Sequence, residues 1–270
     1  MIQFQDRAAS AVAQIDNPGH DNHKIQPVAA RETGMSRPVN FCEWDPQAVA
    51  ELTLAQVARL WNKRAMESSM SSRFDAAIRR FDEVNARDPN TEIVEGVAQP
   101  RELIYSRWLT DWVLKLCPAA GEGLRLAARC QHLCRWQSPR DSYPMTRAGY
   151  LQWRAELKKL HAQKAGEILG EVGYDDETIR RVQEFNLKKN FPNDPESRVL
   201  EDALCLVFLE RQFAELARKT DDEKMINALR KSWKKMTPAA HNHALKLAFG
   251  PHERSLIERA LAASSVADSP

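Results

Sequence analysis

Apolar residues recur with the 3.6-residue period of an α-helix in one segment after another from Ser72 onward. Most of these segments begin at a capping residue or a proline, and the segment 101–116 is apolar on nearly every side, as in a buried helix. Glycine is scarce, with 10 among 270 residues, which disfavours a large β-sheet or a Rossmann half. We therefore predict an all-α fold, a compact multi-helix bundle.

The start and stop signals also predict where the helices lie. One helix runs from Ser72 to before Asp88, and the apolar block 203–209 marks the segment 196–219 as the central helix. The other predicted helices cover about 123–136, 146–170 and 175–190, and three more begin at Thr220, Thr237 and Pro251.

The chain before this bundle has a different composition. Residues 1–69 mix Asn, Gln, Pro, Asp and His without a period, except for a short amphipathic stretch at about 47–66. We therefore predict a disordered leader, 1–69, that carries one short amphipathic helix. The single helical domain is predicted over 70–264, followed by a disordered tail at 265–270.

Cysteine usage and apolar runs predict the compartment. Five cysteines, an odd number, without a secretory signal favour free thiols in a reducing cytoplasm. The longest apolar run, 203–209, is far shorter than the roughly 20 residues of a membrane span. We therefore expect a cytoplasmic protein that does not bind membranes.

Charge is distributed unevenly along the chain. The formal net charge of +2 excludes the strong overall field of a histone-like nucleic-acid binder. Between Arg129 and Lys164, however, eight Lys and Arg residues stand against only Asp141 and Glu156. The candidate substrate-binding residues in this segment are Arg135, Arg140, Tyr143, Arg147, Tyr150, Arg154 and Lys164.

A helix over 123–136 would direct Cys130 and Cys134 toward the core and His132 to the opposite face, beside Arg129 and Arg135. The two cysteines and His132 cannot then converge on one metal ion, so we interpret the cysteines as core residues. The basic face of this helix is either solvated surface or part of a binding site.

His161 lies within the apolar stripe of the predicted helix 146–170, with Arg154 and Lys164 on the same side. An inward imidazole beside two cations should be neutral, and is then available as a base or a metal ligand. The alternative is a core histidine that is held by a hydrogen bond.

Glu201 and Asp202 enter the central helix just before its apolar block, where a carboxylate is partly desolvated. Such a group needs a metal, an arginine or an imidazole as a partner, so Asp202 is either a functional residue or half of an ion pair. Lys188 and Lys189 are either phosphate contacts or the ordinary charges of a helix C-terminus.

Four strings of residues resemble, in order, an uncharacterised all-helical family of bacteria and fungi that is catalogued as a domain of unknown function, number four-two-zero-two. The likeness covers about residues 73–260 and rests on Gln131–Trp136, Pro139–Arg154, His161–Glu167 and Leu200–Glu210. Some fungal members carry a glutamyl-tRNA synthetase label, but this sequence has no nucleotide-binding sheet or class I signature. The resemblance therefore implies an all-helical fold without naming a reaction.

A more distant similarity is to the metal-dependent HD phosphohydrolases. Their pattern is a helix ending in adjacent His and Asp residues, a later His, and a late apolar helix headed by Asp. Here Gln131-His132, His161 and Asp202 stand at these places, and the resemblance implies catalytic roles for His132, His161, Glu201 and Asp202. Because the adjacent aspartate is missing, the resemblance supports at most one divalent metal ion, held by His132, His161 and Asp202.

Three functions follow as hypotheses. The first is an HD-like enzyme that binds, and also hydrolyses, a phosphorylated small molecule such as a nucleotide in a basic cleft. The second is a non-catalytic RNA- or nucleotide-binding module that uses the same basic segment, with Trp136, Tyr143 or Tyr150 stacking on bases. The third is a purely structural partner protein, in which the basic segment is solvated surface.

Overall fold

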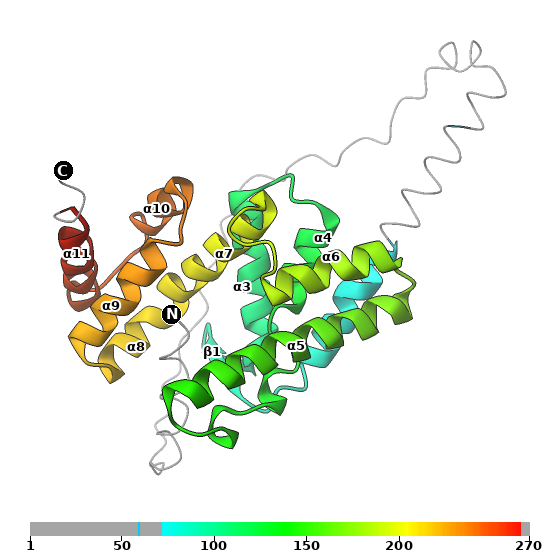
Figure 1. Cartoon of the computed structure of the whole chain (residues 1–270), viewed down its shortest axis with the longest axis horizontal. Helices are drawn as coiled ribbons and strands as arrows, with labels where there is room; N and C mark the ends of the chain where they lie inside the picture. Colours follow the sequence, from blue (N-terminus) through cyan, green and yellow to red (C-terminus); the bar gives the residue numbers. More distant parts are fainter. Residues whose placement is uncertain (1–58, 60–71, 266–270) are drawn as a thin grey trace, which may run out of the picture. The chain divides into compact units, whose positions relative to one another are not determined.

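The computed structural model describes residue 59 and residues 72–265 of the chain (Figure 1). The chain divides into two units, 1–11 with 71–270 and 12–70, and residues 72–265 all belong to the first. Apart from one short hairpin, the regular secondary structure of these residues is helical, which confirms the all-α prediction. The predicted leader with its helix at 47–66, and the tail beyond residue 265, lie outside the described residues.

The elements follow one another in a simple order. A helix over 72–85 precedes the strands β1 (Thr91–Val94) and β2 (Val97–Pro100). The helices are then α3 (Arg101–Leu116), α4 (Glu122–Cys130), α5 (Arg147–Val172), α6 (Asp176–Leu187), α7 (Pro195–Val207), α8 (Phe213–Lys219), α9 (Asp222–Trp233), α10 (Pro238–Ala244) and α11 (Pro251–Ser265). Short 3₁₀ turns at Arg135–Gln137 and Arg140–Ser142 lie between α4 and α5, and a π-helical turn, Phe208–Gln212, joins α7 to α8.

Local capping explains why most helices begin where the sequence predicts. The Thr146 side chain accepts a hydrogen bond from the Gly149 amide at the start of α5, and Asp175 accepts one from the Thr178 amide at the start of α6. Thr237 caps α10 in the same way. The α9 cap is Asp221 rather than the predicted Thr220, so that prediction is wrong by one residue.

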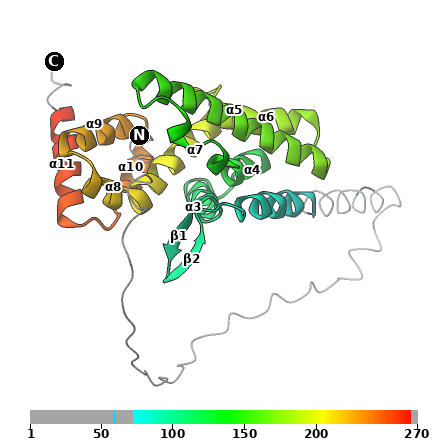
Figure 2. The same cartoon turned by 90° about the horizontal axis from the view of Figure 1, so that it is seen from below.

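The hairpin was not predicted from the sequence. Its two strands pair in register from Thr91 with Pro100 to Val94 with Val97, and Figure 2 shows it extending from the start of α3. Glu95 and Gly96 join the strands with positive φ angles of 52° and 79°, as a tight two-residue turn requires. Strands of four residues are too short to show a clear alternation of apolar and polar side chains.

Helix α4 ends at Cys130, so the prediction that it continues to about Trp136 is wrong. Turns occupy residues 131–134, and Cys134 adopts a left-handed conformation with φ 58°. This change of direction turns His132 inward, where only 7% of the residue is exposed. The expectation that His132 shares an outer face with arginines is therefore also wrong.

The helices pack in two neighbourhoods on either side of α7 and α8 (Figures 1 and 2). On one side α5 packs along α6, and α3 lies against α4 and α7. On the other side α9 lies against α11, and α10 packs on α7. The apolar block 203–207 of α7 is fully covered, which confirms that the segment predicted over 196–219 is central.

Candidate functional site

A cluster of buried polar side chains lies where α3, the turn after α4 and α5 meet. The Glu102 carboxyl of α3 lies 3.1 Å from Nδ1 of His132, and the Tyr105 ring stacks on the His132 ring at 4.3 Å. The ring of His161 lies 5.8 Å from that of His132, and its Nδ1 donates to the Leu133 carbonyl at 2.8 Å. We call Glu102, Tyr105, His132 and His161 the acid–imidazole cluster.

Burial controls the protonation of this cluster. Burial raises the pKa of Glu102, against the opposing effect of the Arg135 guanidinium. Burial, reinforced by Arg135 and Arg154, lowers the pKa of His132 well below its usual value. Burial and the neighbouring His132 lower the pKa of His161 to about 3. Both imidazoles are therefore neutral at physiological pH, as the sequence predicted for His161.

Arg135 covers this cluster. Its guanidinium Nε lies 3.5 Å from Glu102 Oε1, and its side chain is only 11% exposed. The same guanidinium lies over the buried Trp153 ring, 5.0 Å from the centroid. Arg135, one of the predicted substrate-binding residues, is thus tied directly to a buried acid, and it supports the fold of the cluster.

Glu201 of α7 forms a second buried centre. Its carboxylate, 6% exposed, pairs with Lys188 at the end of α6 and with Lys235 beyond α9, the latter at 3.2 Å. Burial alone would raise the pKa of Glu201, but Lys188 and Lys235 outweigh it and lower the pKa to about 2. The sequence predicted that a carboxylate here needs a metal, an arginine or an imidazole; the partners of Glu201 are instead two lysines from separate elements.

Two further cations from α5 join this centre. Gln183 of α6 donates to the Ala162 carbonyl at 3.1 Å, which fixes how α5 and α6 lie side by side. The two helices run in opposite directions, so the end of α6, with Lys188, lies near Lys158 of α5. Lys158 itself follows Arg154 by one helical turn. The pKa of the half-buried Lys158 is lowered, first by burial and then by Lys188 and Arg154. We call Arg154, Lys158, Lys188 and Lys235 around Glu201 the basic cluster.

Asp202 does not join either cluster. Its carboxylate accepts hydrogen bonds from the Thr237 amide, at 2.9 Å, and from the Thr237 hydroxyl, at 2.5 Å. Thr237 is the cap of α10, so Asp202 holds the start of one helix against the side of another. Its hydrogen-bond partner is none of the three that the sequence suggested, a metal, an arginine or an imidazole, but a threonine.

Several predicted substrate-binding residues have other partners. Arg140 donates to the carbonyls of Tyr143 and Pro144 within its own loop, and Tyr143 donates to Glu156 at 2.6 Å. Lys164 pairs with Glu167 on the surface of α5. Arg147 is exposed, and the Tyr150 ring lies 5.8 Å from Trp153. Arg140 and Tyr150 lie beside the Trp153 ring, with the Arg140 guanidinium 5.9 Å from the Tyr150 centroid, whereas Lys164 is paired elsewhere on α5.

The predicted metal ligands are not brought together as a set. The two imidazoles are neighbours, whereas Asp202 is bonded to Thr237. Among the described residues, no group of three or more His, Cys, Asp or Glu side chains has an arrangement that could hold a metal ion. Cys130 and Cys134 are buried free thiols, and burial raises the pKa of Cys130 to about 12.

Sequence reasoning missed Glu102 and Lys235. Each is an ordinary charged residue in its own segment, and its partner lies about 30 residues away along the chain, His132 for Glu102 and Glu201 for Lys235. One local signal for Glu102 existed, since Asp88 accepts from the Glu102 amide at 3.0 Å and so fixes the start of α3. No comparable local signal marks Lys235.

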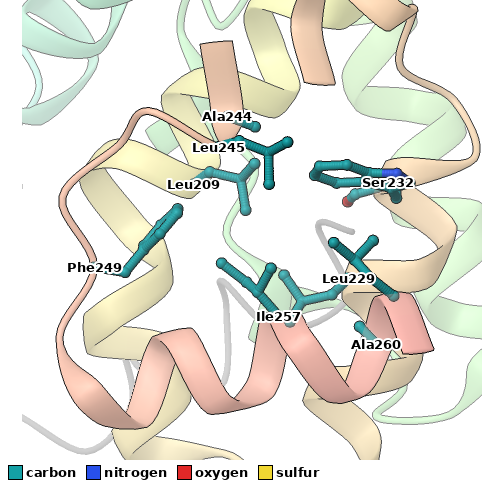
Figure 3. Close-up of a pocket in the computed structure, with 10 residues that line it drawn as sticks. Leu209, Leu229, Ser232, Ala244, Leu245, Phe249, Ile257 and Ala260 are labelled. Carbon is teal, nitrogen blue, oxygen red and sulfur yellow. The ribbon is translucent and has the colours of Figure 1, made fainter. Parts of the chain in front are cut away.

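A separate apolar recess lies among the C-terminal helices (Figure 3). Its interior volume is about 10 Å³, roughly the space of one water molecule, which is too small for a metabolite. The residues that line it are Leu209, Leu229, Ser232, Trp233, Ala244, Leu245, Phe249, Ile257, Ala260 and Leu261. None of the predicted site residues is among them.

Within the described part of the chain, every helix is too short or too polar to cross a membrane. No curated protein and no solved structure matches the chain, so the likeness to HD phosphohydrolases stays a prediction. A family model does match, over residues 75–257, which is more than half of the chain. The chain belongs to the family described as Domain of unknown function (DUF4202).

Proposed function

We propose that this protein binds a small phosphorylated molecule at the basic cluster. One observation carries the proposal: Lys188 and Lys235 share a single buried carboxylate, Glu201, and the half-buried Lys158 of α5 lies close enough for the charges of all three to act on it. Like charges this close repel one another, and burial adds the cost of desolvating them. An anionic ligand relieves both costs, since phosphate oxygens accept strong charge-assisted hydrogen bonds from Lys and Arg.

Hydrolysis is not part of the proposed function. A general base works best when its pKa lies near the working pH, and burial lowers the pKa of both His132 and His161 far below neutrality. Asp202, the third predicted catalytic residue, is bonded to Thr237. Glu201 pairs with two lysines and is a counter-ion within the binding site.

The basic cluster favours a compact ligand over RNA. Its cations gather around one carboxylate, whereas an RNA surface needs cations spread along a groove together with exposed rings for stacking. The three rings suggested for this role, Trp136, Tyr143 and Tyr150, are half-buried, and Tyr143 is bonded to Glu156. We propose the cytoplasm as the compartment, supported by the four described free cysteines.

Thermal unfolding of the full-length protein tests the proposal. Inorganic phosphate, glycerol 3-phosphate, ATP and a short RNA would each be added in turn, without divalent metal. A ligand present at a hundred times its dissociation constant adds about 2.7 kcal/mol to the free energy of unfolding, which raises the melting temperature visibly. We expect at least one of the phosphorylated small molecules to do so.

Two neighbouring lysines of α5 provide a matched pair of variants. Lys158→Gln removes a half-buried member of the basic cluster, whereas Lys159→Gln removes an exposed charge one residue away. We expect the ligand-induced shift to be lost in Lys158→Gln and kept in Lys159→Gln. Equal loss in both variants, or a shift with RNA alone, would overturn the proposal. Phosphate release that depends on Glu102 and His132 would make the protein a hydrolase instead.

A further inference from the structure

We infer that the β1–β2 hairpin is an interaction surface whose partner is a second copy of this chain, paired edge to edge along β1. In the described part of the chain the sheet has only these two strands, so each has a backbone edge without a neighbouring strand. Helix α3 contacts both strands, and the hairpin extends away from it with Ile93 67% exposed (Figure 2). A hairpin of two strands is marginal in water, and a third strand stabilises it.

The register of the hairpin selects β1 as the edge that accepts a partner. The two-residue turn makes Val94 and Val97 a hydrogen-bonded pair, and such pairs alternate with non-hydrogen-bonded pairs along the strands. The backbone N–H and C=O groups of Ile93 consequently point away from β2. On the other edge Pro100 occupies an outward-facing position and has no N–H group to donate. A sheet joined through β1 therefore has a Pro100 edge on both sides, which disfavours growth beyond two copies.

Such a pair is also complementary in charge. When two copies of β1 run antiparallel about a two-fold axis at Ile93, Thr91 of each copy lies opposite Glu95 of the other. The Arg101 guanidinium lies at this end of β1, 3.4 Å from the Thr91 carbonyl oxygen and 3.7 Å from Glu92, and its side chain is 44% exposed. Glu95 is exposed at the tip of the hairpin, so it meets Arg101 of the second copy. The symmetric pair thus gains two ion pairs and a cross-strand contact between the two Ile93 side chains.

Sedimentation velocity of the full-length protein over a range of protein concentrations tests the inference. We expect the mass of a dimer at high concentration and of a monomer on dilution, because an edge of four residues buries little surface. Ile93→Lys places a charge at the centre of the pair and should abolish the dimer. Leu151→Lys is a matched change on α5, at a side chain that is 56% exposed, and should leave the dimer intact.

An exchange of charges tests the register of the pair. Glu95→Arg and Arg101→Glu each bring like charges together, so each should raise the dissociation constant of the dimer at least about fivefold. The double variant restores opposite charges and should restore the dimer, which a general loss of stability would not do.

Hydrogen exchange at the Ile93 amide gives a second readout. This amide should exchange more slowly as the protein concentration rises, because its N–H group donates to the second copy. A wild-type protein that is monomeric at every concentration would overturn the inference, as would a dimer that Ile93→Lys leaves intact or a double variant that stays monomeric. Slow exchange of this amide in a monomer would overturn it too, since another segment would then cover β1. None of these outcomes bears on ligand binding at the basic cluster.

Discussion

The turn at residues 131–134, which ends in the left-handed Cys134, places two functional candidates. Because the chain turns at residues 131–134, His132 enters the interior and Arg135 reaches back to Glu102. The sequence predicted a continuous helix here, since Leu126, Cys130 and Leu133 keep a helical period past the point where the helix ends. The inward position of His161 could be predicted, because its stripe lies within a helix that does form.

Burial of the imidazoles predicts that acid weakens the fold. The unfolded chain binds protons on histidine below pH about 6.5, while folded His161 resists protonation down to a pKa of about 3. Stability is therefore fully present above pH about 6.5 and is lost as the pH falls through the window between these values. Urea unfolding at a series of pH values measures this loss.

His161→Asn tests the cause of that loss. Asparagine retains an N–H group that suits the Leu133 carbonyl but does not titrate. The variant should lose up to about 1.4 kcal/mol per pH unit from the slope of unfolding free energy between pH about 6.5 and 4.5. Glu102, with its raised pKa, opposes the histidines in both proteins and so cancels in the comparison. An identical slope in wild type and variant would contradict the explanation.

At the scale of helices, agreement with the sequence depends on how local the signal is. The caps of α5 and α10 were predicted correctly, because each is set by residues within one turn of the boundary. The bounds of α3 also agree with the sequence, which marks its start by Pro100. The hairpin was not predicted because its strands are too short to show a pattern. The end of α4 was predicted too late, because the helical period of apolar residues continues beyond the residue where the helix stops. The sequence predicted only part of the basic cluster: Lys188 and Arg154 were candidate binding residues, but Lys235 was not.

The entry into α5 depends on a close backbone approach at Gly149. A Cβ atom at this position would lie 2.2 Å from the carbonyl oxygen of Pro144, in the loop where Arg140 binds the same carbonyl. Gly149→Ala should therefore destabilise the protein by about 1 to 3 kcal/mol, as measured by urea unfolding. Gly170→Ala, near the other end of α5, places its Cβ 4.0 Å from Ile179 and should be neutral or stabilising. If both variants changed the free energy of unfolding equally, the close approach of Gly149 to Pro144 would not explain the loss of stability.

At the scale of the whole described domain, Asp202 links the two neighbourhoods of helices. It lies on α7, and both of its hydrogen bonds go to Thr237, which begins α10. Asp202→Ala leaves a partly buried amide without its acceptor, which should cost about 1 to 3 kcal/mol of stability. Hydrogen exchange should accelerate most in the α10 amides, since that helix loses its attachment to α7.

Asp222→Ala provides the control for this prediction. Asp222 begins α9 and pairs on the surface with Arg259 and His252, where ion pairs contribute about 1 kcal/mol or less. The control should change neither the exchange of α10 nor the melting shift caused by a phosphorylated ligand. If Asp202→Ala abolished that shift while stability stayed the same, Asp202 would be a binding residue, as the sequence first suggested.

The two-lysine partnership of Glu201 has an evolutionary consequence. Lys188 and Lys235 share the single carboxylate of Glu201 in a partly buried position, so the loss of Glu201 leaves two neighbouring ammonium groups without their counter-ion. A change at Glu201 alone is therefore disfavoured, and it should occur together with changes at the lysines. Members of the family that lack an acid at the position of Glu201 are expected to lack at least one of the two lysines too.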